Sequence, residues 1–465
     1  MTDTKRIEFE PVTRLEGHAK ISLDVSGGKL QKCNFQVIEP PRLFEKFMEG
    51  VPAEDAPQLS ERICGICSVT HHLASVKAVE AAWGVTPTKQ GEKLRYLENL
   101  GGYIHSHTLH LVYLALPDFI SPEEPHVLAV AQKEPKLAKL GIELRMFGQK
   151  ITKAIGGRMI HPCTAVPGGV AEPLGEEDAR TLAKEAPKAM ATARAITDLY
   201  FKLAKDKELF RIDSYSREPT HFLGLHQKGV HDLYDGDLRF VKPDGTKLRD
   251  FKAKDYLDHI AEAAMPYCTV KYPYIKDLGP AKGNYRVGPL ARLNVADKMP
   301  TPIAQGYAEQ FFDLFGGRPV LDPMGYHLAR AIEVVTSLEL AIPLLEDTTL
   351  QEDNHRIPVE PRAGDGVGVT EAPRGTLFHH YTTNDDGILT KVNILVATAQ
   401  NVRTIERHVQ AKAHELLPEL LKPRPHCLKA VSAMEVAVRA YDMCISCSVH
   451  TIEVKTDRGI ISLDS

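Results

Sequence analysis

Two short stretches near opposite ends of the chain, RICGIC at residues 62–67 and CISC at residues 444–447, constrain its fold more than any others. Each contains a Cys-x-x-Cys pair. A two-residue gap lets two thiolates reach one metal ion, and a nearby cation lowers the pKa of the thiols so that both can ionise. The sequence therefore predicts one metal centre that uses both pairs.

The four cysteines of these pairs, Cys64, Cys67, Cys444 and Cys447, are also the usual ligand set of a structural zinc site. Zinc-binding pairs typically lie about 12–20 residues apart, whereas 377 positions separate Cys67 from Cys444. A small zinc-stapled module cannot be built across that distance, so the whole fold must close around an internal centre. The separation favours a catalytic metal, and structural zinc is the alternative.

The composition is that of an ordinary folded protein of 465 residues, with 43% hydrophobic and 25% charged residues. A net charge of −4, from 57 basic and 61 acidic residues, argues against a nucleic-acid-binding or polybasic membrane-binding surface. Eight cysteines are too few for a disulfide framework. We see no apolar leader and no apolar run of membrane-spanning length, so we expect a cytoplasmic protein with reduced thiols.

The hydrophobic periodicity predicts an α+β fold, mainly α, with a central bundle of long helices and peripheral β-hairpins. Helices are expected at residues 91–116, 128–155, 176–205, 303–315, 326–345, 399–421 and 428–441. Hairpins are expected from residues 19–25 with 30–37, from 238–241 with 246–251, and within 451–463, with a loop at 358–365 and a short strand at 393–396. Because the cysteine centre ties both ends together, we expect one domain over residues 1–465.

The residues around both cysteine pairs resemble the large, catalytic subunit of nickel–iron hydrogenases, and similar motifs follow in the family's order along the chain. They are PVTRLEGH at 11–18, RICGIC at 62–67 with His71, GGR at 156–158 with HP at 161–162 and PGG at 167–169, YRVGPLAR at 285–292, EAPRG at 371–375 and DMCISCSVH at 442–450. The resemblance is to the cytosolic, multimeric group of methyl-viologen-reducing and bidirectional enzymes.

The resemblance implies reversible heterolytic cleavage of dihydrogen into protons and electrons. It implies a nickel–iron centre whose iron carries one carbon monoxide and two cyanide ligands. By position, Cys64 and Cys444 are terminal nickel ligands, and Cys67 and Cys447 bridge nickel and iron, which agrees with the affinity of soft thiolates for these metals. The base is a nickel-bound thiolate, Cys444 first, or the guanidine of Arg374, whose other possible role is to orient the gas and stabilise charge.

Further residues around the centre receive roles from the same resemblance. Glu16 is expected to be the first proton carrier, and pairing with Arg14 is its structural alternative. Thr398 and backbone groups near Arg374 are expected to hydrogen-bond the cyanide ligands, and Pro373 is expected to contact the cofactor. His71 is expected to donate to a bridging sulfur, and its alternative is a buried core histidine.

A second metal site is also implied by the resemblance. Glu45 and His450, with a backbone carbonyl near Leu395 or Val396, match the family's site for magnesium or iron. Hard oxygen ligands favour magnesium.

The other cysteines, Cys33, Cys163, Cys268 and Cys427, follow no motif and are expected to be small buried residues. We find no iron–sulfur pattern in this chain. The resemblance therefore implies that electrons pass to a small subunit with iron–sulfur clusters and then to further electron-transfer subunits. The sequence does not identify the final acceptor.

Three features depart from the family's usual pattern. Met443 replaces a proline before Cys444, which removes a constraint on φ there. Ser106 stands where many relatives have an aspartate, so the resemblance supplies no carboxylate for Arg374 at that position. Residues 451–465 resemble a maturation extension that is removed after His450, and we expect the active form to end there.

Three other functional classes share features with this sequence. A metal-free relative in a quinone-side respiratory subunit is disfavoured because all four cysteines are present. A hydrogen sensor with the same centre and slow turnover remains an alternative, as does a zinc-stapled structural subunit of a redox complex.

Overall fold

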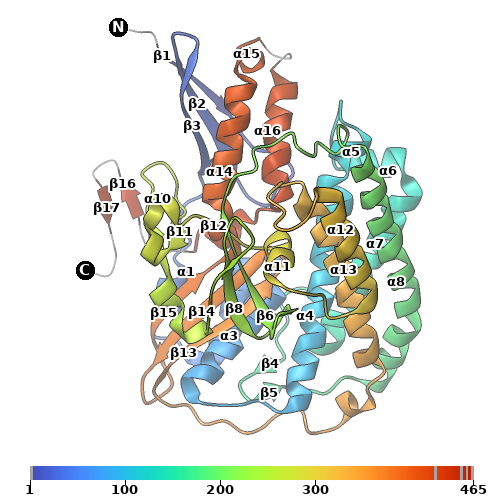
Figure 1. The fold of residues 1–465 in the computed structure, drawn as a ribbon. Helices are drawn as coiled ribbons and strands as arrows, with labels where there is room; N and C mark the ends of the chain where they lie inside the picture. Colours follow the sequence, from blue (N-terminus) through green and yellow to red (C-terminus); the bar gives the residue numbers. More distant parts are fainter. Residues whose placement is uncertain (1–3, 424–426, 451–453, 457–458, 462–465) are drawn as a thin grey trace.

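A bundle of long helices forms one flank of the molecule (Figure 1). The computed structural model describes residues 4–423, 427–450, 454–456 and 459–461. The bundle consists of α4 (Lys89–Leu109), α7 (Pro135–Gly156), α8 (Glu176–Lys205), α12 (Pro302–Phe315) and α13 (Gly325–Leu345). Helix α4 packs between α7 and α13, while α8 and α12 cover the outer faces of α13.

A second layer is built from α3 (Ser68–Trp83) and the antiparallel sheet β13 (Gly364–Ala372), β14 (Gly375–Thr383) and β15 (Leu389–Leu395). Alternate glycines on β13 allow helix and strand to touch backbone to backbone. A Cβ atom on Gly364, Gly366 or Gly368 would lie 1.8–2.1 Å from backbone atoms of Ala82 or Ala74 in α3. Because residues two apart face the same side of a strand, the three glycines form a flat seat for α3.

Neither α3 nor the strands β13 and β14 were predicted from the sequence. Almost every residue of α3 is buried, so the helix has no polar face and lacks the amphipathic period that identified the other helices. The glycines of β13 weaken its strand pattern in the same way. The predicted loop at 358–365 ends where β13 begins at Gly364. The strand predicted at 393–396 corresponds to the last part of β15.

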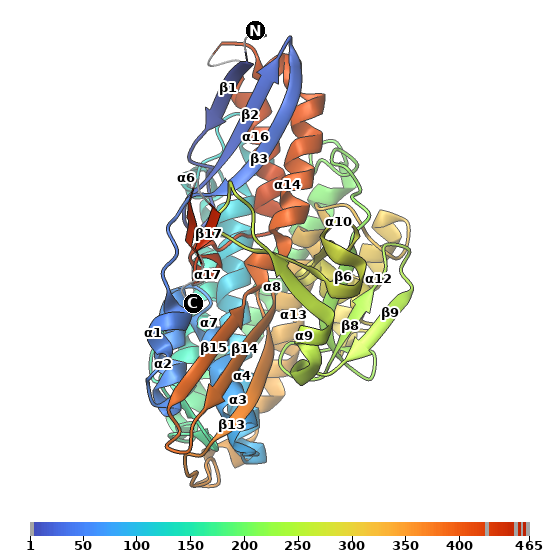
Figure 2. The same cartoon turned by 90° about the vertical axis from the view of Figure 1, so that its left-hand side faces the viewer.

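The predicted N-terminal hairpin is confirmed as part of a three-stranded antiparallel sheet, β1 (Thr4–Phe9), β2 (Ala19–Ser26) and β3 (Lys29–Val37). Its β3 strand packs on α14 (Ala397–Glu415), which in turn packs on α16 (Leu428–Ala440). Figure 2 shows this sheet and the two helices together at one end of the molecule. The N-terminal sheet and the helices α14 and α16 are therefore neighbours in space.

A third sheet lies on the face beside α13. It contains β6 (His221–Gln227), β8 (Asp237–Val241), β9 (Lys247–Phe251) and β12 (Tyr285–Arg286), with β7 (Val230–His231) paired to β6. The hairpin predicted at 238–241 and 246–251 is the pair β8–β9. Helix α11 (Pro289–Val295) packs on β6. A separate short hairpin pairs β10 (Ile260–Ala263) with β11 (Tyr272–Ile275).

The helix predicted at 128–155 is wrong as a single element. It is divided into α6 (Leu128–Lys133) and α7, because Pro135 disfavours helical backbone at Glu134, which has φ −133° and ψ 61°. The helix predicted at 399–421 is likewise interrupted before Pro418, with α14 ending at Glu415 and α15 (Leu417–Leu420) following. Helix α4 continues into a π-helical turn at His110–Ala115.

The hairpin predicted within 451–463 corresponds to the antiparallel pair β16 (Val454–Thr456) and β17 (Gly459–Ile461). Positions 451–453, 457–458 and 462–463 of that prediction lie outside the described residues. Across the ranges that the structure describes, we find no helix with the length and apolar character needed to cross a membrane.

One continuous apolar core extends from Phe9 near the N-terminus to Val449 and includes all four cysteines of the two pairs. The fold is α+β and mainly helical, as the sequence predicts. The closure of one core around residues from both ends is the feature that positions the site.

Candidate metal centre

The four paired cysteines meet in the core. Their Sγ atoms all lie within 4.8 Å of one another. The shortest contacts are 3.1 Å for Cys64–Cys444, 3.2 Å for Cys67–Cys447 and 3.1 Å for Cys444–Cys447. These distances exceed the roughly 2.05 Å of a disulfide bond, and all four thiols are free. The predicted union of the two pairs is therefore present.

The first pair is held by regular structure. Cys64 follows a short 3-10 turn at Glu61–Ile63, and Cys67 is the residue that precedes the first turn of α3. Because α3 packs tightly on β13, the position of α3 fixes the loop of Cys64 and Cys67 that leads into it. Gly65, between the two cysteines, is exposed, whereas Ile66 is half-buried and packs against the core.

The second pair is held by residues from distant parts of the chain. Cys444 directly precedes α17 (Ile445–Ser448), a helix of four residues that contains Cys447. The segment at Glu16 runs parallel to it: the Ile445 N–H donates to the Glu16 carbonyl at 3.0 Å, and Glu16 N–H donates to the carbonyl of Met443 at 3.4 Å. The backbone of Glu16 thus pairs with the backbone of Met443 and Ile445, on either side of Cys444.

Arg42, which the sequence interpretation did not single out, links the two loops. Its Nη2 donates to the carbonyl of Ile63, directly before Cys64, at 2.5 Å, and to the carbonyl of Ser446, between Cys444 and Cys447. Its backbone N–H donates to the carbonyl of Val449 at 2.5 Å. The only sequence signal was its position three residues before Glu45.

The four Sγ atoms form a ligand set that suits soft metal ions. The four thiols are at most 5% exposed. Hydrogen bonds from Cys444 first, and then from Cys447 and Cys67, lower the pKa of Cys64, whereas the contact with Cys447 raises the pKa of Cys444. Four buried thiols this close cannot all ionise unless a cation compensates their charge. Nickel and low-spin iron are among the metals that prefer such ligands.

Glu16 lies against this cluster and not against Arg14. Its Oε2 accepts from the Cys444 thiol at 3.2 Å and from the Ser446 N–H at 2.9 Å, and its Oε1 accepts from the Ser446 hydroxyl. Arg14 instead pairs with Asp118 and donates to the carbonyl of Leu114 at 2.7 Å. A carboxylate is thus in hydrogen-bond contact with a ligand thiol.

Arg374 projects from the turn between β13 and β14 towards the thiols and is 3% exposed. Its Nη2 donates to Oδ1 of Asp442 at 3.0 Å and its Nε donates to the Asp442 carbonyl at 2.6 Å, while the Ser106 hydroxyl lies 3.4 Å from Nη1. Asp442 therefore supplies the carboxylate that the serine at position 106 does not. The sequence interpretation quoted Asp442 within a motif and gave it no role.

Electrostatics keep this pair ionised. Burial opposes the charged form of Asp442, yet Arg374 and, more weakly, His110 and Arg330 hold the pKa of the carboxyl well below its usual range. In the opposite direction, Asp442 and the neighbouring thiols outweigh burial and keep the pKa of Arg374 above its ordinary value. Arg374 therefore presents a fixed positive charge to the cysteine cluster.

Thr398 lies beside the same thiols, whereas Pro373 contacts Arg292. The Thr398 hydroxyl, near the start of α14, accepts from the Cys444 N–H at 3.2 Å. The carbonyl of Pro373 accepts from Nη2 of Arg292 at 3.2 Å. A small hollow next to the cluster is lined by Cys67, His71, Ala372, Arg374, Leu377, Val396, Ala397, Thr398 and Cys447.

His71, in the first turn of α3, has its Nδ1 3.1 Å from Nε2 of His379. Burial lowers the pKa of His71 to about 3, so its ring is neutral at ordinary pH. The predicted hydrogen bond from His71 to a sulfur stays a prediction.

The residues expected at a second metal site also converge. Glu45 on α1 (Phe44–Met48) accepts from the N–H of Ile394 at 2.7 Å, and Nε2 of His450 lies 3.8 Å from its Oε1. The same His450 nitrogen contacts the carbonyl of Ile394. The carbonyl in contact with His450 is that of Ile394, next to the last residue of β15, and the predicted ligand carbonyl near Leu395 or Val396 stays a prediction.

The remaining cysteines do not join a cluster. Among the residues that the structure describes, the paired cysteines are the one group of three or more Cys, His, Asp or Glu ligand atoms close enough to share an ion. Cys33, Cys268 and Cys427 are buried as expected, whereas Cys163 is half-buried.

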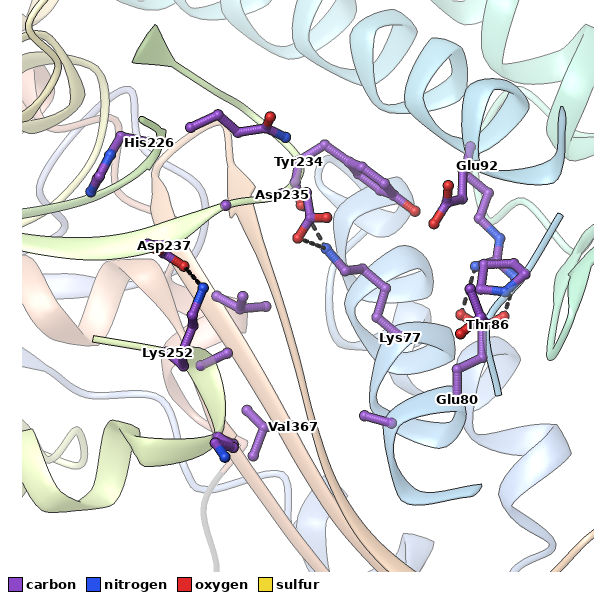
Figure 3. Close-up of a pocket in the computed structure, with 18 of the residues that line it drawn as sticks. Lys77, Glu80, Thr86, Glu92, His226, Tyr234, Asp235, Asp237, Lys252 and Val367 are labelled. Carbon is purple, nitrogen blue, oxygen red and sulfur yellow. Dashed lines mark hydrogen bonds and ion pairs between the residues drawn. The ribbon is translucent and has the colours of Figure 1, made fainter. Parts of the chain in front are cut away.

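One large cavity lies away from the thiols. It is an open cleft of about 850 Å³ between α3, α4 and the third sheet, and its lining includes Lys77, Glu80, Arg95, Asp237 and Lys252. Figure 3 shows that its charged groups face one another: Lys77 lies 3.5 Å from an oxygen of Asp235, and Lys252 pairs with Asp237. None of the predicted site residues lines this cleft.

Comparison with known proteins gives one consistent result. A family described as nickel-dependent hydrogenase matches residues 42–140 and 227–450, and a HoxL-like family matches residues 6–39. The chain is 44% identical over 413 residues to a vhu subunit of the F420-non-reducing hydrogenase of Methanocaldococcus jannaschii, covering 88% of this chain and 98% of that protein. It is 42% identical over 457 residues to an F420-non-reducing hydrogenase subunit of Methanothermobacter marburgensis, covering 96% and 95%.

A solved structure agrees with these relatives. The fold is similar to that of an NAD+-reducing [NiFe]-hydrogenase crystallised in the H2-reduced state, with a TM-score of 0.91 and 35% sequence identity. The match covers 97% of this chain and all of the other.

Proposed function

The chain belongs to the nickel-dependent hydrogenase family as a large subunit, and from that premise we propose how its residues cleave dihydrogen. It is the oxidoreductase subunit in which a nickel–iron centre splits H2 into protons and electrons. One observation carries the assignment of the site: the two cysteine pairs, from opposite ends of the chain, bring four Sγ atoms within 4.8 Å. In this proposal Cys64 and Cys444 would hold nickel, and Cys67 and Cys447 would hold nickel and iron together.

The bound centre supplies a Lewis acid that polarises H2 and accepts its electrons. Heterolytic cleavage also requires a base for the first proton, and we assign that base to the Cys444 thiolate. Glu16 then receives the proton, because its Oε2 lies 3.2 Å from Cys444 Sγ and a carboxyl at hydrogen-bond distance is a competent carrier. The contact with Ser446 holds Glu16 in this orientation.

Arg374 acts as a fixed charge and not as the base. Its ion pair with Asp442 at 3.0 Å supports a guanidinium that stays protonated, since arginine gives up its proton only at very high pH. A preorganised positive charge aimed at the thiols stabilises negative charge that develops there during cleavage. Asp442 orients the guanidinium through two hydrogen bonds.

We further propose that the iron would carry one carbon monoxide and two cyanide ligands, and that the Thr398 hydroxyl and backbone N–H groups near Arg374 would hydrogen-bond the cyanides, with Pro373 in contact with the cofactor through its ring. The hollow beside Cys67 and Cys447, which Thr398 and Arg374 line, supports this proposal. Glu45, His450 and the Ile394 carbonyl are the proposed ligands of a second metal, for which their oxygen atoms favour magnesium.

The proposed partner is a small subunit with iron–sulfur clusters, followed by further electron-transfer subunits. In this proposal the electrons leave the cysteine cluster through that small subunit. We place its docking face beside the first cysteine loop. Gly65 is exposed there, and the N–H of His161, which donates to the Ser68 hydroxyl at 3.2 Å, brings Met159 and Ile160, each 42% exposed, close to it.

The whole chain is proposed to be one domain, because its core is continuous from Phe9 to Val449. We also propose that residues 451–465 are removed after His450 in the active form. Intact-protein mass spectrometry of active enzyme tests this, and a fully retained tail contradicts it. The cytoplasm is the proposed location, since all eight cysteines are free thiols.

Isotope exchange on the intact complex tests the proposed mechanism. We expect the purified complex to convert D2 to HD and H2 in ordinary water without an electron acceptor, because cleavage and proton release occur in this subunit. Glu16→Gln retains nickel and lowers that exchange at least a hundredfold. The control is Glu39, a nearby carboxylate that accepts from the His18 N–H. Glu39→Gln retains the wild-type rate. Normal exchange in Glu16→Gln would contradict the assigned proton route.

A further inference from the structure

The motif YRVGPLAR at residues 285–292 supplies no ligand to the cysteine cluster, yet it ends in one of the largest fully buried side chains, Arg292 on α11. A guanidinium carries five N–H donors. All five are used here. They donate to Glu333 Oε1 and Oε2 at 2.7 Å each, to Glu371 Oε2 at 2.7 Å, and to the carbonyls of Ala372 at 3.0 Å and Pro373 at 3.2 Å.

Three of these acceptors belong to the residues directly before Arg374. The turn from β13 to β14 has only Pro373 and Arg374 between the paired residues Ala372 and Gly375. Arg292 therefore binds two consecutive carbonyls of that turn as well as the side chain of the residue that leads into it. A planar guanidinium fixes direction as well as distance in such contacts.

Glu371 fastens the same turn from its other side. While Oε2 accepts from Arg292, Oε1 accepts from the N–H of Leu225 at 2.9 Å and from the hydroxyl of Thr376 at 2.8 Å. The carboxylate thus joins α11, β6 and both strands of the hairpin. Glu371 and Thr376 are fully buried, and the network leaves the turn no alternative hydrogen-bonding arrangement that would keep its polar groups paired.

The other end of Arg292 is anchored in the helical bundle. Glu333 on α13 also accepts from Nε2 of His107 at 2.9 Å and from Nε2 of His231 at 3.1 Å. Gly288, in the same motif, lies so near the turn that a Cβ atom there would be 2.7 Å from the carbonyl oxygen of Arg374. The motif therefore contacts the turn twice: Gly288 packs against the Arg374 backbone, and Arg292 hydrogen-bonds the carbonyls of Ala372 and Pro373.

We propose that Arg292 is a positioning residue for hydrogen cleavage: it fixes the turn at 372–375 so that the Arg374 guanidinium is held beside Asp442 and the four thiols. The role of Arg374 itself rests on the proposed function above, whereas the placement of its turn by Arg292 rests on the contacts just described. Lysine at position 292 has three donors in place of five and cannot reproduce the planar set.

The test uses the intact complex with Arg292→Lys, and Arg95→Lys is the matched control. Arg95 is also fully buried, donates to both oxygens of Glu80 at 2.7 and 2.9 Å, and donates to two carbonyls of a short hairpin, those of Val166 and Gly169. These acceptors all lie outside the Arg374 turn, so the Arg95 variant measures the general cost of losing a buried arginine.

Two readouts are measured in each variant. The first is backbone amide hydrogen exchange in a peptide covering residues 371–378, which does not depend on turnover. The second is the D2-exchange rate per bound nickel. We expect Arg292→Lys to exchange amide hydrogens at least tenfold faster in that peptide and to lose at least tenfold in D2-exchange rate per nickel. Arg95→Lys leaves both unchanged.

A double-variant cycle separates positioning from a purely structural role. In an Arg374→Lys background, Arg292→Lys should lower the rate per nickel by less than a further twofold, because its effect passes through Arg374. Independent multiplicative losses would overturn the proposal, as would wild-type amide exchange in Arg292→Lys. If Arg374→Lys retains the full rate, the proposed role of Arg374 fails, and amide exchange alone then decides whether Arg292 places the turn.

Discussion

The loop of Cys64 and Cys67 and the loop of Cys444 and Cys447 have the same spacing but are held in different ways. The first precedes α3, a sixteen-residue helix seated on β13. The second adjoins a four-residue helix and is held by Glu16, Arg42 and Thr398 from elsewhere in the chain. One half of the centre therefore follows from local structure, and the other half forms only when the chain has closed.

The largest effect should come from the support of the first loop. Gly366→Ala places a Cβ 2.0 Å from the backbone nitrogen of Ala82, and neither backbone can yield without separating α3 from β13. We expect a loss of about 4 kcal/mol or more of unfolding free energy, above the usual range for overpacking. Thermal and denaturant unfolding of the complex measure it.

Gly306→Ala is the control for that substitution. Gly306 lies in α12 with nothing within 4 Å of the added Cβ, so we expect no loss and a gain of up to about 1 kcal/mol from helix propensity. Equal stability of the two variants would contradict the seating of α3 on β13.

The next effect tests the link between the two loops. Arg42→Met removes the guanidinium that binds carbonyls on both sides, at Ile63 and Ser446, and leaves two partly buried acceptors unpaired. At about 1–3 kcal/mol for an unpaired buried group, we expect a cost of about 3 kcal/mol and at least a tenfold loss of bound nickel. Nickel analysis of the purified subunit measures it, with the exposed Arg6→Met as control. Full nickel occupancy in Arg42→Met would show that the loops meet without this link.

A smaller change is confined to the second loop. Thr398→Val keeps the volume of the side chain but removes the oxygen that accepts from the Cys444 N–H. Leaving that N–H unpaired should cost about 1–2 kcal/mol and lower nickel retention during dialysis. Thr336→Val, which removes a hydroxyl that donates only to the Ile332 carbonyl in α13, should not change retention. Similar nickel loss in both variants would argue against a specific support of Cys444 by Thr398.

The smallest effect concerns acid stability of α14, the helix that carries Thr398. Burial lowers the pKa of His408 from 6.5 to about 3, so the unfolded chain binds a proton there that the folded chain does not. Stability therefore falls as pH decreases through 6.5. We expect this residue to contribute about 0.7 kcal/mol of destabilisation between pH 7 and pH 6.

His408→Gln should remove that part of the pH dependence. His414→Gln, at an exposed position of the same helix, should leave the pH dependence unchanged. Unfolding in denaturant at both pH values distinguishes them, and an unaltered slope in His408→Gln would contradict the stated cause.

The difference between the loops also explains what sequence reasoning could reach. The cysteines, Glu16 and Arg374 lie in contiguous motifs, so their chemistry could be predicted before the fold was known. Arg42 was missed because its role depends on carbonyls at positions 63 and 446, and backbone acceptors leave no trace in sequence. The role of Arg292 was missed for the same reason.

Burial limited the prediction of the fold in a similar way. The amphipathic helices of the bundle and the N-terminal hairpin carry a periodic pattern, which identified them. Helix α3 is buried on almost all sides and its seat on β13 is made of glycine, so both elements lack that pattern. The partner of Arg374 illustrates the limit: Asp442 was quoted in a motif, but only the three-dimensional turn shows that it contacts the guanidinium.

Metal content tests the central claim most directly. The intact complex is analysed for nickel, iron and zinc together with its infrared spectrum, in the wild type, in Cys447→Ser and in the control Cys427→Ser, whose thiol is buried outside the cluster. We predict one nickel and one additional iron for each copy of this chain, with carbonyl and cyanide stretching bands, in the wild type and the control. Cys447→Ser should lack both the nickel and the bands. Full occupancy by zinc, without those bands, would contradict the claim.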